Sequence, residues 1–220
     1  MAEKIVISWP EGQVSGRLTG SGSNGILLAH GAGTNQDHPF MVALRDGLAE
    51  AGHTTMTFNY PYTERGSTRP DRTEKLVGAH RAAADFLAAR VEALFLAGRS
   101  MGGRMATYLV AEGYRAAGVV LYAYPLHPAG KEENLRVAHF HDVTVPLLFF
   151  QGTRDALSRT ELFDRHIRPL PNVTVEILEG ASHSFRGGGW TETAMLERLV
   201  KGTSAWIESV SSGRSQGTGP

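Results

Sequence analysis

Short apolar and β-branched runs, each bounded by glycine or proline, alternate along the chain with longer stretches of helical periodicity. The longer stretches start and stop at helix signals, such as Pro39 before one segment and Gly52 after it, and Asp71 is expected to cap another. A short helix is predicted around 133–140. The predicted strands are 4–9, 13–19, 25–30, 54–58, 93–98, 118–123, 146–151 and 173–178, and the longer predicted helices are 39–51, 73–90, 101–112 and 191–209.

The order of these elements indicates an α/β fold. Two strands come first and strand–helix repeats follow, which predicts a mainly parallel eight-stranded sheet flanked by helices on both faces. We expect one domain over 1–210 and a flexible C-terminal tail over 211–220, where periodicity and large apolar side chains are lacking. Sheets of this kind bind ligands at the carboxyl ends of their strands, so the loops there are the places to look for chemistry.

Composition narrows the function classes. The 22 Lys and Arg residues balance 22 Asp and Glu residues, which argues against nucleic-acid partners and against a polybasic membrane surface. The apolar runs stay well below the roughly 18 residues of a membrane span, and the N-terminus has no signal-peptide pattern, so we expect a soluble cytoplasmic monomer or homodimer. The absence of cysteine excludes disulfides, thiolate metal sites and a cysteine nucleophile.

A candidate nucleophile lies at 98–102, where an apolar strand leads into Gly-Arg-Ser-Met-Gly and a helical stripe follows directly. This is the G-x-S-x-G pattern in the strand–turn–helix setting that it requires. A tight turn exposes the Ser100 hydroxyl above the sheet, and the flanking glycines let the strand and the helix pass closely. The N–H of Met101 is then placed at a helix N-terminus to donate to an oxyanion.

A second oxyanion donor is expected from the glycine-rich segment 30–33, which follows an early apolar strand. Its small residues allow the backbone to approach a substrate carbonyl. We expect the donor to be the N–H of Ala32, with that of Gly33 as the alternative. His30 is expected to be structural and to bond to neighbouring loops.

The general base and its orienting acid are expected in the order serine, aspartate, histidine along the chain. Asp155 lies just past the end of a strand, and His183 lies on the loop after the last strand. Rival residues are placed less well: Asp142 precedes its strand, and Asp164 and His166 lie in a helical stretch. His139 and His141 would share a face in an extended segment, but a third metal ligand is missing, so no metal site and no cofactor are expected.

These residues resemble the α/β-hydrolase family. The resemblance is carried by HGAG at 30–33, GRSMGG at 98–103, QGTRD at 151–155 and SHSF at 182–185, and with the strand pattern it covers about 5–209. It is strongest to small, lid-poor proteins grouped with dienelactone hydrolase, although that enzyme uses cysteine where this chain has Ser100. AHGAGTNQDHPFM and the following FNYPYTERGSTRPDR also look like a subgroup related to a subunit of a nuclear histone-acetyltransferase complex, which leaves a non-catalytic scaffold as an alternative.

The family resemblance and the three side chains together imply a serine hydrolase acting on a small-molecule carboxylic ester, with thioesters and amides as alternatives on the same residues. The gap between the strands that end near Tyr124 and begin near Pro146 is too short for a full lid domain, so an open site is expected. The charged loop 60–72 is expected to be solvated rather than to hold a substrate carboxylate. Candidates for an apolar rim are Tyr60, Tyr62, Leu126, Phe185 and Trp190, with ordinary packing in the core or at the surface as an equal alternative for each.

Overall fold

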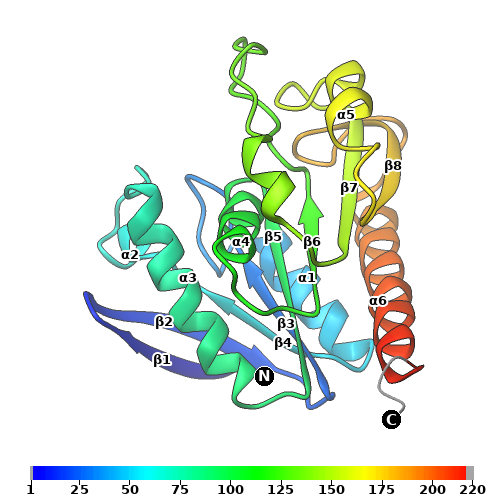
Figure 1. Cartoon of the computed structure of the whole chain (residues 1–220). Helices are drawn as coiled ribbons and strands as arrows, with labels where there is room; N and C mark the ends of the chain where they lie inside the picture. Colours follow the sequence, from blue (N-terminus) through cyan, green and yellow to red (C-terminus); the bar gives the residue numbers. More distant parts are fainter. Residues whose placement is uncertain (1, 217–220) are drawn as a thin grey trace.

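A computed structural model describes residues 2–216 and shows one eight-stranded sheet between two layers of helices (Figure 1). Across the sheet the strands run in the order β1-β2-β4-β3-β5-β6-β7-β8, which places β5 near the centre. Strand β2 pairs antiparallel with β1 and with β4, and every other neighbouring pair is parallel. The strands are β1 (Glu3–Trp9), β2 (Gly12–Thr19), β3 (Asn24–Ala29), β4 (Thr54–Phe58), β5 (Ala93–Arg99), β6 (Gly118–Tyr122), β7 (Leu147–Arg154) and β8 (Val173–Ser182).

The predicted fold class is therefore confirmed, and all eight predicted strands are present. The largest differences are at the ends of β7 and β8, which continue past the predicted ends at 151 and 178. The two strands keep pairing beyond an irregularity between Gly152 and Arg154, where Arg154 is the partner of Ser182. This extension carries the chain to within one residue of Asp155 on β7 and of His183 on β8.

The helices cover both faces of the sheet, because the strands of a parallel sheet are apolar on both sides and must be buried on both. Helices α1 and α6 cover one face, where Met41, Leu44 and Leu199 are buried, and α3 and α4 cover the other, where Leu76 and Met105 are buried. The helices are α1 (Pro39–Glu50), α2 (Pro61–Glu64), α3 (Thr73–Ala88), α4 (Met101–Ala111), the 3₁₀ helix η1 (Ala138–Asp142), α5 (Thr160–His166) and α6 (Glu192–Gln216).

Three local predictions differ from the structure. The residue that caps α3 is Arg72, without a side-chain bond, because the carboxylate of Asp71 accepts a hydrogen bond from Arg65 Nη2 at 2.6 Å instead. The short helix expected at 133–140 is a 3₁₀ turn at Ala138–Asp142, preceded by separate tight turns. Helix α6 continues to Gln216, well past the predicted end at 209, and residues 217–220 of the expected tail lie outside the described part of the chain.

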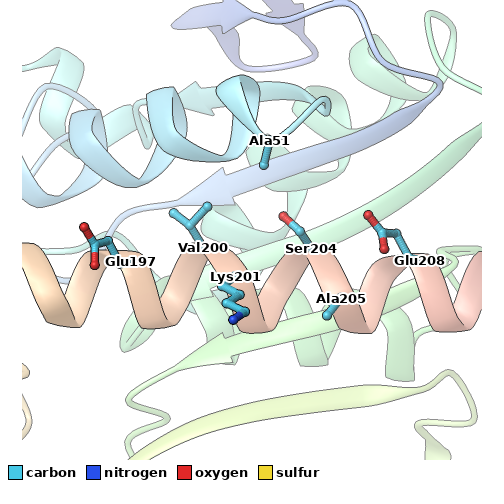
Figure 2. A pocket seen from close by; sticks show the side chains of 7 residues that line it. All are labelled: Ala51, Glu197, Val200, Lys201, Ser204, Ala205 and Glu208. Atoms are coloured by element: carbon cyan, nitrogen blue, oxygen red, sulfur yellow. The ribbon is translucent and has the colours of Figure 1, made fainter.

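The surface of the helix layer carries a shallow groove between the end of α1 and the exposed side of α6 (Figure 2). Seven residues line it: Ala51, Glu197, Val200, Lys201, Ser204, Ala205 and Glu208. The predicted site residues are not among them. Within residues 2–216, no helix combines the length and the apolar character needed to cross a membrane.

Candidate active site

Ser100 stands on the turn that joins β5 to α4, at the carboxyl end of a central strand. Its φ of 52° and ψ of −115° lie in a region that side chains other than glycine rarely adopt, and the Ser100 N–H donates to the Tyr122 carbonyl at 2.9 Å. A Cβ at Gly98 would collide with the Gly102–Gly103 peptide, and one at Gly102 would collide with the Ala29 carbonyl. The glycines therefore permit the close strand–helix packing that holds Ser100 in this strained conformation.

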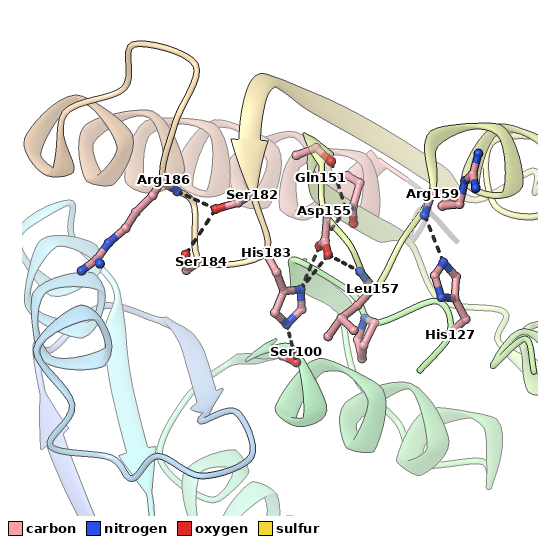
Figure 3. Close-up of polar contacts among 12 residues, drawn as sticks. Ser100, His127, Gln151, Asp155, Leu157, Arg159, Ser182, His183, Ser184 and Arg186 are labelled. Carbon is pink, nitrogen blue, oxygen red and sulfur yellow. Dashed lines mark hydrogen bonds and ion pairs between the residues drawn. The ribbon is translucent and has the colours of Figure 1, made fainter. Parts of the chain in front are cut away.

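His183 connects Ser100 to Asp155 in one chain of hydrogen bonds (Figure 3). The distance from His183 Nε2 to Ser100 Oγ is 2.9 Å, and Nδ1 lies 2.8 Å from Asp155 Oδ2 and 3.0 Å from Oδ1. Because an ionised carboxylate only accepts, His183 must donate from Nδ1, which leaves Nε2 to accept from the serine hydroxyl. The three predicted side chains meet although 83 residues separate Ser100 from His183.

Asp155 is held in one orientation by a residue of β7 and by the loop that follows this strand. The Asp155 side chain is fully buried, and its oxygens also accept from the Leu157 N–H at 2.8 Å and from Gln151 Nε2 at 3.0 Å. Hydrogen bonds to the charged form favour it and offset the loss of water. The His183 side chain remains 25% exposed, so solvent and ligands can reach the imidazole while the carboxylate behind it stays dry.

The rival residues lie elsewhere. Asp142 is exposed at the end of η1 beside His141, and Asp164 pairs with Arg168 along the chain at 2.8 Å. His139 Nε2 bonds to Thr107 Oγ1 at 2.9 Å, and His166 ends α5. Among residues 2–216, no three His, Asp or Glu side chains gather in a metal-binding arrangement.

The loop after β3 presents its backbone to Ser100. A Cβ at Gly31 would lie only 3.6 Å from that of Ser100. The Gly31 carbonyl is bonded to His30 Nδ1 at 2.8 Å and accepts from Thr34 Oγ1 at 3.0 Å. Every peptide bond in the described chain is trans, so the Ala32 N–H points in the direction opposite to this fixed carbonyl.

Tyr62 supports the same loop. Its hydroxyl donates to the Gly31 carbonyl at 3.4 Å. Burial raises the pKa of Tyr62 to about 12, so the hydroxyl stays protonated and able to donate at neutral pH. Ala32 and Gly33 are both exposed, so the direction of the Ala32 N–H, set by the fixed Gly31 carbonyl, is the feature that favours Ala32 as the donor.

His30 has the structural role expected of it. Its Nε2 accepts from the Tyr60 N–H at 3.2 Å while Nδ1 donates to Gly31, which joins the loops after β3 and β4. Burial lowers the pKa of His30 to about 4, so the ring is neutral near pH 7 and can fill both hydrogen-bonding roles.

Four of the five candidates for an apolar rim are core residues instead, which is the alternative that the sequence left open. Tyr60, Tyr62 and Leu126 are fully buried in the core, and Phe185 is 4% exposed. The tyrosines can be buried because their hydroxyls find partners, as in the 3.0 Å contact of Tyr60 with His80 Nδ1. Only half-buried Trp190 keeps surface near the site, and its Nε1 donates to the Glu179 carbonyl at 3.0 Å.

The glutamate and the arginines of the charged loop 60–72 are exposed, as expected, and two of them also have partners on the protein. Glu64 accepts from Ser15 N–H at 2.8 Å and from its hydroxyl at 2.5 Å, and Arg65 bonds to Asp71.

Two neighbours of the site, Gln151 and Arg99, have no role in the sequence-based prediction. Both lie inside the motifs that carry the family resemblance. Only their positions could have pointed to them: Gln151 is near the end of the strand that leads to Asp155, and Arg99 directly precedes Ser100.

Comparison with known proteins shows the family and the fold of the chain. Residues 22–208 match the family model described as an alpha/beta hydrolase domain. The human protein ABHD14B is 28% identical over 174 residues, covering 76% of this chain and 78% of its own. Dienelactone hydrolase from Anabaena variabilis superposes with a TM-score of 0.77 at 21% identity, covering 95% and 97% of the two chains. A cold-adapted esterase from an Arctic intertidal metagenomic library gives 0.71 at 18% identity, covering 94% and 93%.

Proposed function

The chain belongs to the alpha/beta hydrolase family, and from that premise we propose that it is a serine hydrolase that cleaves carboxylic esters through an acyl-enzyme. The observation that carries the proposal is the unbroken series of hydrogen bonds from Ser100 through His183 to buried Asp155. An esterase and a dienelactone hydrolase among the proteins of the same fold support ester chemistry.

In the first half of the reaction, Ser100 Oγ attacks the ester carbonyl carbon while His183 Nε2 takes the hydroxyl proton. The carbonyl π electrons move onto oxygen, and the resulting oxyanion accepts hydrogen bonds from the N–H groups of Met101 and Ala32. When the tetrahedral intermediate collapses, the C–O bond to the alcohol breaks and His183 returns the proton to the leaving oxygen. Asp155 stabilises the imidazolium and keeps the ring in the reactive tautomer.

Water completes the cycle. It attacks the acyl-enzyme carbonyl as His183 removes its proton, and collapse of the second intermediate expels Ser100 Oγ, which is reprotonated by His183. The free acid leaves and the protein returns to its starting state. Preference for Ala32 over Gly33 as the second donor is supported by the fixed Gly31 carbonyl, which belongs to the same peptide unit as the Ala32 N–H and sets its direction.

Substitution Ser100→Ala tests the proposal. With p-nitrophenyl butyrate as substrate, we expect kcat/KM to fall by at least about 10³-fold, because the attacking atom is gone. Ser8→Ala on the exposed edge strand β1 is the matched control and should leave turnover unchanged. Both proteins should keep the circular dichroism spectrum of the parent chain. Full turnover by Ser100→Ala would refute the assignment.

The identity of the leaving group needs a second assay, because thioesters and amides form the same acyl-enzyme. We expect the purified protein to hydrolyse an ester faster than a thioester or an anilide of the same acyl group. A dominant thioesterase or amidase activity would retain the nucleophile but replace the substrate class. A chain that turns over none of them would be a scaffold.

A further inference from the structure

Arg99 places a guanidinium beside the nucleophile. It is the last residue of β5, directly before Ser100. The position that a Cβ would take at Gly31 is 3.6 Å from Ser100 Cβ and 4.0 Å from Arg99 Nη1. One point in the site is therefore bordered by the nucleophile and by the cationic group, and the Ala32 amide follows on the same loop.

This guanidinium has no anionic partner. Among residues 2–216, no carboxylate lies within ion-pair distance of Arg99, and its Nε is buried without a hydrogen-bond partner. Asp155 attracts it at longer range, but the Asp155 oxygens already serve His183, Gln151 and Leu157. The packing contact of the group is the ring of Phe40, 5.3 Å from the guanidinium carbon.

A half-buried cation that has no counterion within the protein is available to pair with an anion of a ligand, because partial burial has already removed some of its water. Other arginines of the chain show the usual solution, such as Arg159 with Glu132 at 3.0 Å and Arg168 with Asp164 at 2.8 Å. A guanidinium binds a carboxylate through two parallel N–H groups, which fixes direction as well as charge.

The charged groups around Arg99 suit a ligand that carries a single negative charge. Besides the catalytic His183, two titratable groups interact electrostatically with Arg99: Asp155, which is bonded to His183, and His38, which precedes α1. Burial and the nearby Arg99 both lower the pKa of His38, so His38 is neutral at pH 7 and adds no second cation. One guanidinium faces the site without its own partner, which matches a monoanionic carboxylate better than a dianion.

We propose that Arg99 binds a carboxylate on the substrate, so that the site selects esters bearing one free carboxylate over neutral esters of the same size. The proposal rests on the function proposed for Ser100, because it concerns the substrate of that nucleophile. Arg99 is a specificity-determining residue in this account: it holds one end of the substrate while Ser100 attacks the other.

A purely structural Arg99 would behave differently. If its role were only to pack on Phe40 or to support Asp155, its replacement would slow neutral and charged esters equally. If it binds a substrate carboxylate, replacement penalises the charged ester alone and acts mainly on KM. The ratio of kcat/KM for charged and neutral substrates therefore separates the two roles.

The kinetic experiment uses two substrate pairs. One places the carboxylate on the acyl side (p-nitrophenyl hydrogen adipate against p-nitrophenyl hexanoate), and the other on the alcohol side (4-butanoyloxybenzoate against phenyl butanoate). We expect the parent protein to prefer the charged member of one pair by about tenfold or more, and Arg99→Gln to abolish that preference. Arg99→Lys, which keeps the charge, should retain part of it, and Arg115→Gln in the distant α4–β6 loop should retain all of it. Absence of a charge preference in both pairs, or its survival in Arg99→Gln, would overturn the proposal.

A binding measurement keeps the test independent of turnover. Calorimetric titration of the Ser100→Ala protein with monomethyl adipate and with methyl hexanoate should show tighter binding of the charged ester by about tenfold or more. Adding Arg99→Gln should make the two esters bind equally. Equal binding with Arg99 intact would overturn the carboxylate site whatever the activity. Selective binding in a protein that hydrolyses no ester would instead overturn the proposed function and leave the carboxylate site standing.

Discussion

Two segments leave the sheet on either side of the strand that carries Ser100, and they are attached to the protein in different ways. The loop 30–38 follows β3, and the segment 123–146 follows β6; both strands are direct neighbours of β5. In the first, the Gly31 carbonyl is held by three side-chain groups and His30 is completely buried. In the second, the tip at 129–134 is mostly exposed and is shaped by successive tight turns.

The difference separates two tasks of the site. A peptide that stabilises an oxyanion is effective when it is already oriented before the reaction, because no reorganisation is then needed. Buried, neutral partners such as His30 and Tyr62 provide that orientation. The segment after β6 occupies the place where a lid would be inserted, and its exposed tip makes surface contacts only. We therefore expect changes in the first segment to act on kcat, and changes at the tip of the second to leave catalysis intact.

The largest effect is expected from removing the Ala32 N–H. Ala32→Pro should lower kcat for p-nitrophenyl butyrate by about 10²- to 10³-fold with little change in KM, because one oxyanion donor is lost. Ala32→Gly keeps the N–H and is the matched control, expected within a few-fold of the parent. A proline variant with parental kcat and an intact fold would show that Ala32 is not the donor.

A smaller effect is expected from pH, through the buried histidines behind the same loop. Burial lowers the pKa of His30 to about 4 and that of His80 to about 3, whereas both are near 6.5 when unfolded. Between pH 6.5 and these folded values the unfolded state binds more protons, so stability is complete above pH 6.5 and is lost as the pH falls. At pH 5 each histidine should lower the free energy of unfolding by about 1–2 kcal/mol relative to pH 7.

Denaturant titrations at pH 7 and pH 5 measure this loss. His80→Gln retains an acceptor for the Tyr60 hydroxyl but removes the titrating group, so its stability should fall less between the two pH values than that of the parent. His141→Gln, at an exposed position, is the control and should behave like the parent. An unchanged pH dependence in His80→Gln would mean that His80 titrates alike in both states.

The smallest effect is expected at the tip of the second segment. Glu132 accepts from Arg159 at 3.0 and 3.1 Å, but both side chains are well exposed, and solvent screening makes such a pair contribute little to stability. Glu132→Gln should change the midpoint of thermal unfolding by no more than a few degrees and leave kcat/KM unchanged. A tenfold loss of activity would show that this segment takes part in catalysis and would break the comparison.

The same contrast explains what the sequence could predict. Strand periodicity and glycine-bounded turns predicted all eight strands. They also predicted the residues that meet at Ser100, because the carboxyl ends of parallel strands lie at the same edge of the sheet. The strand pattern could not distinguish a tyrosine in the core from one at the rim of the site. Tyr60 and Tyr62 are candidates for either place, because a tyrosine can be buried only if its hydroxyl finds a partner, and that partner can be distant in sequence, as His80 is.

The predictions of helix caps and of side-chain partners failed for a related reason: both depend on contacts that are made only in the folded chain. Asp71 has the right type and spacing to cap α3, but Arg65 competes for its carboxylate. Gln151, four residues before Asp155, donates to the acid across the irregular end of β7, and this irregularity has no signal in the strand periodicity. Arg99 was visible in the motif, yet its lack of a partner is a property of the whole surrounding structure and could not be read from its neighbours along the chain.

Covalent labelling with a fluorophosphonate tests the central claim most directly, because it requires an activated serine and no knowledge of the substrate. After incubation of the folded protein, peptide mass spectrometry should find one adduct, on Ser100. His183→Ala should label far more slowly, since the base that takes the hydroxyl proton is missing, and Ser100→Ala should remain unlabelled. A parent protein that stays unlabelled, or that labels equally well without His183, would contradict the account.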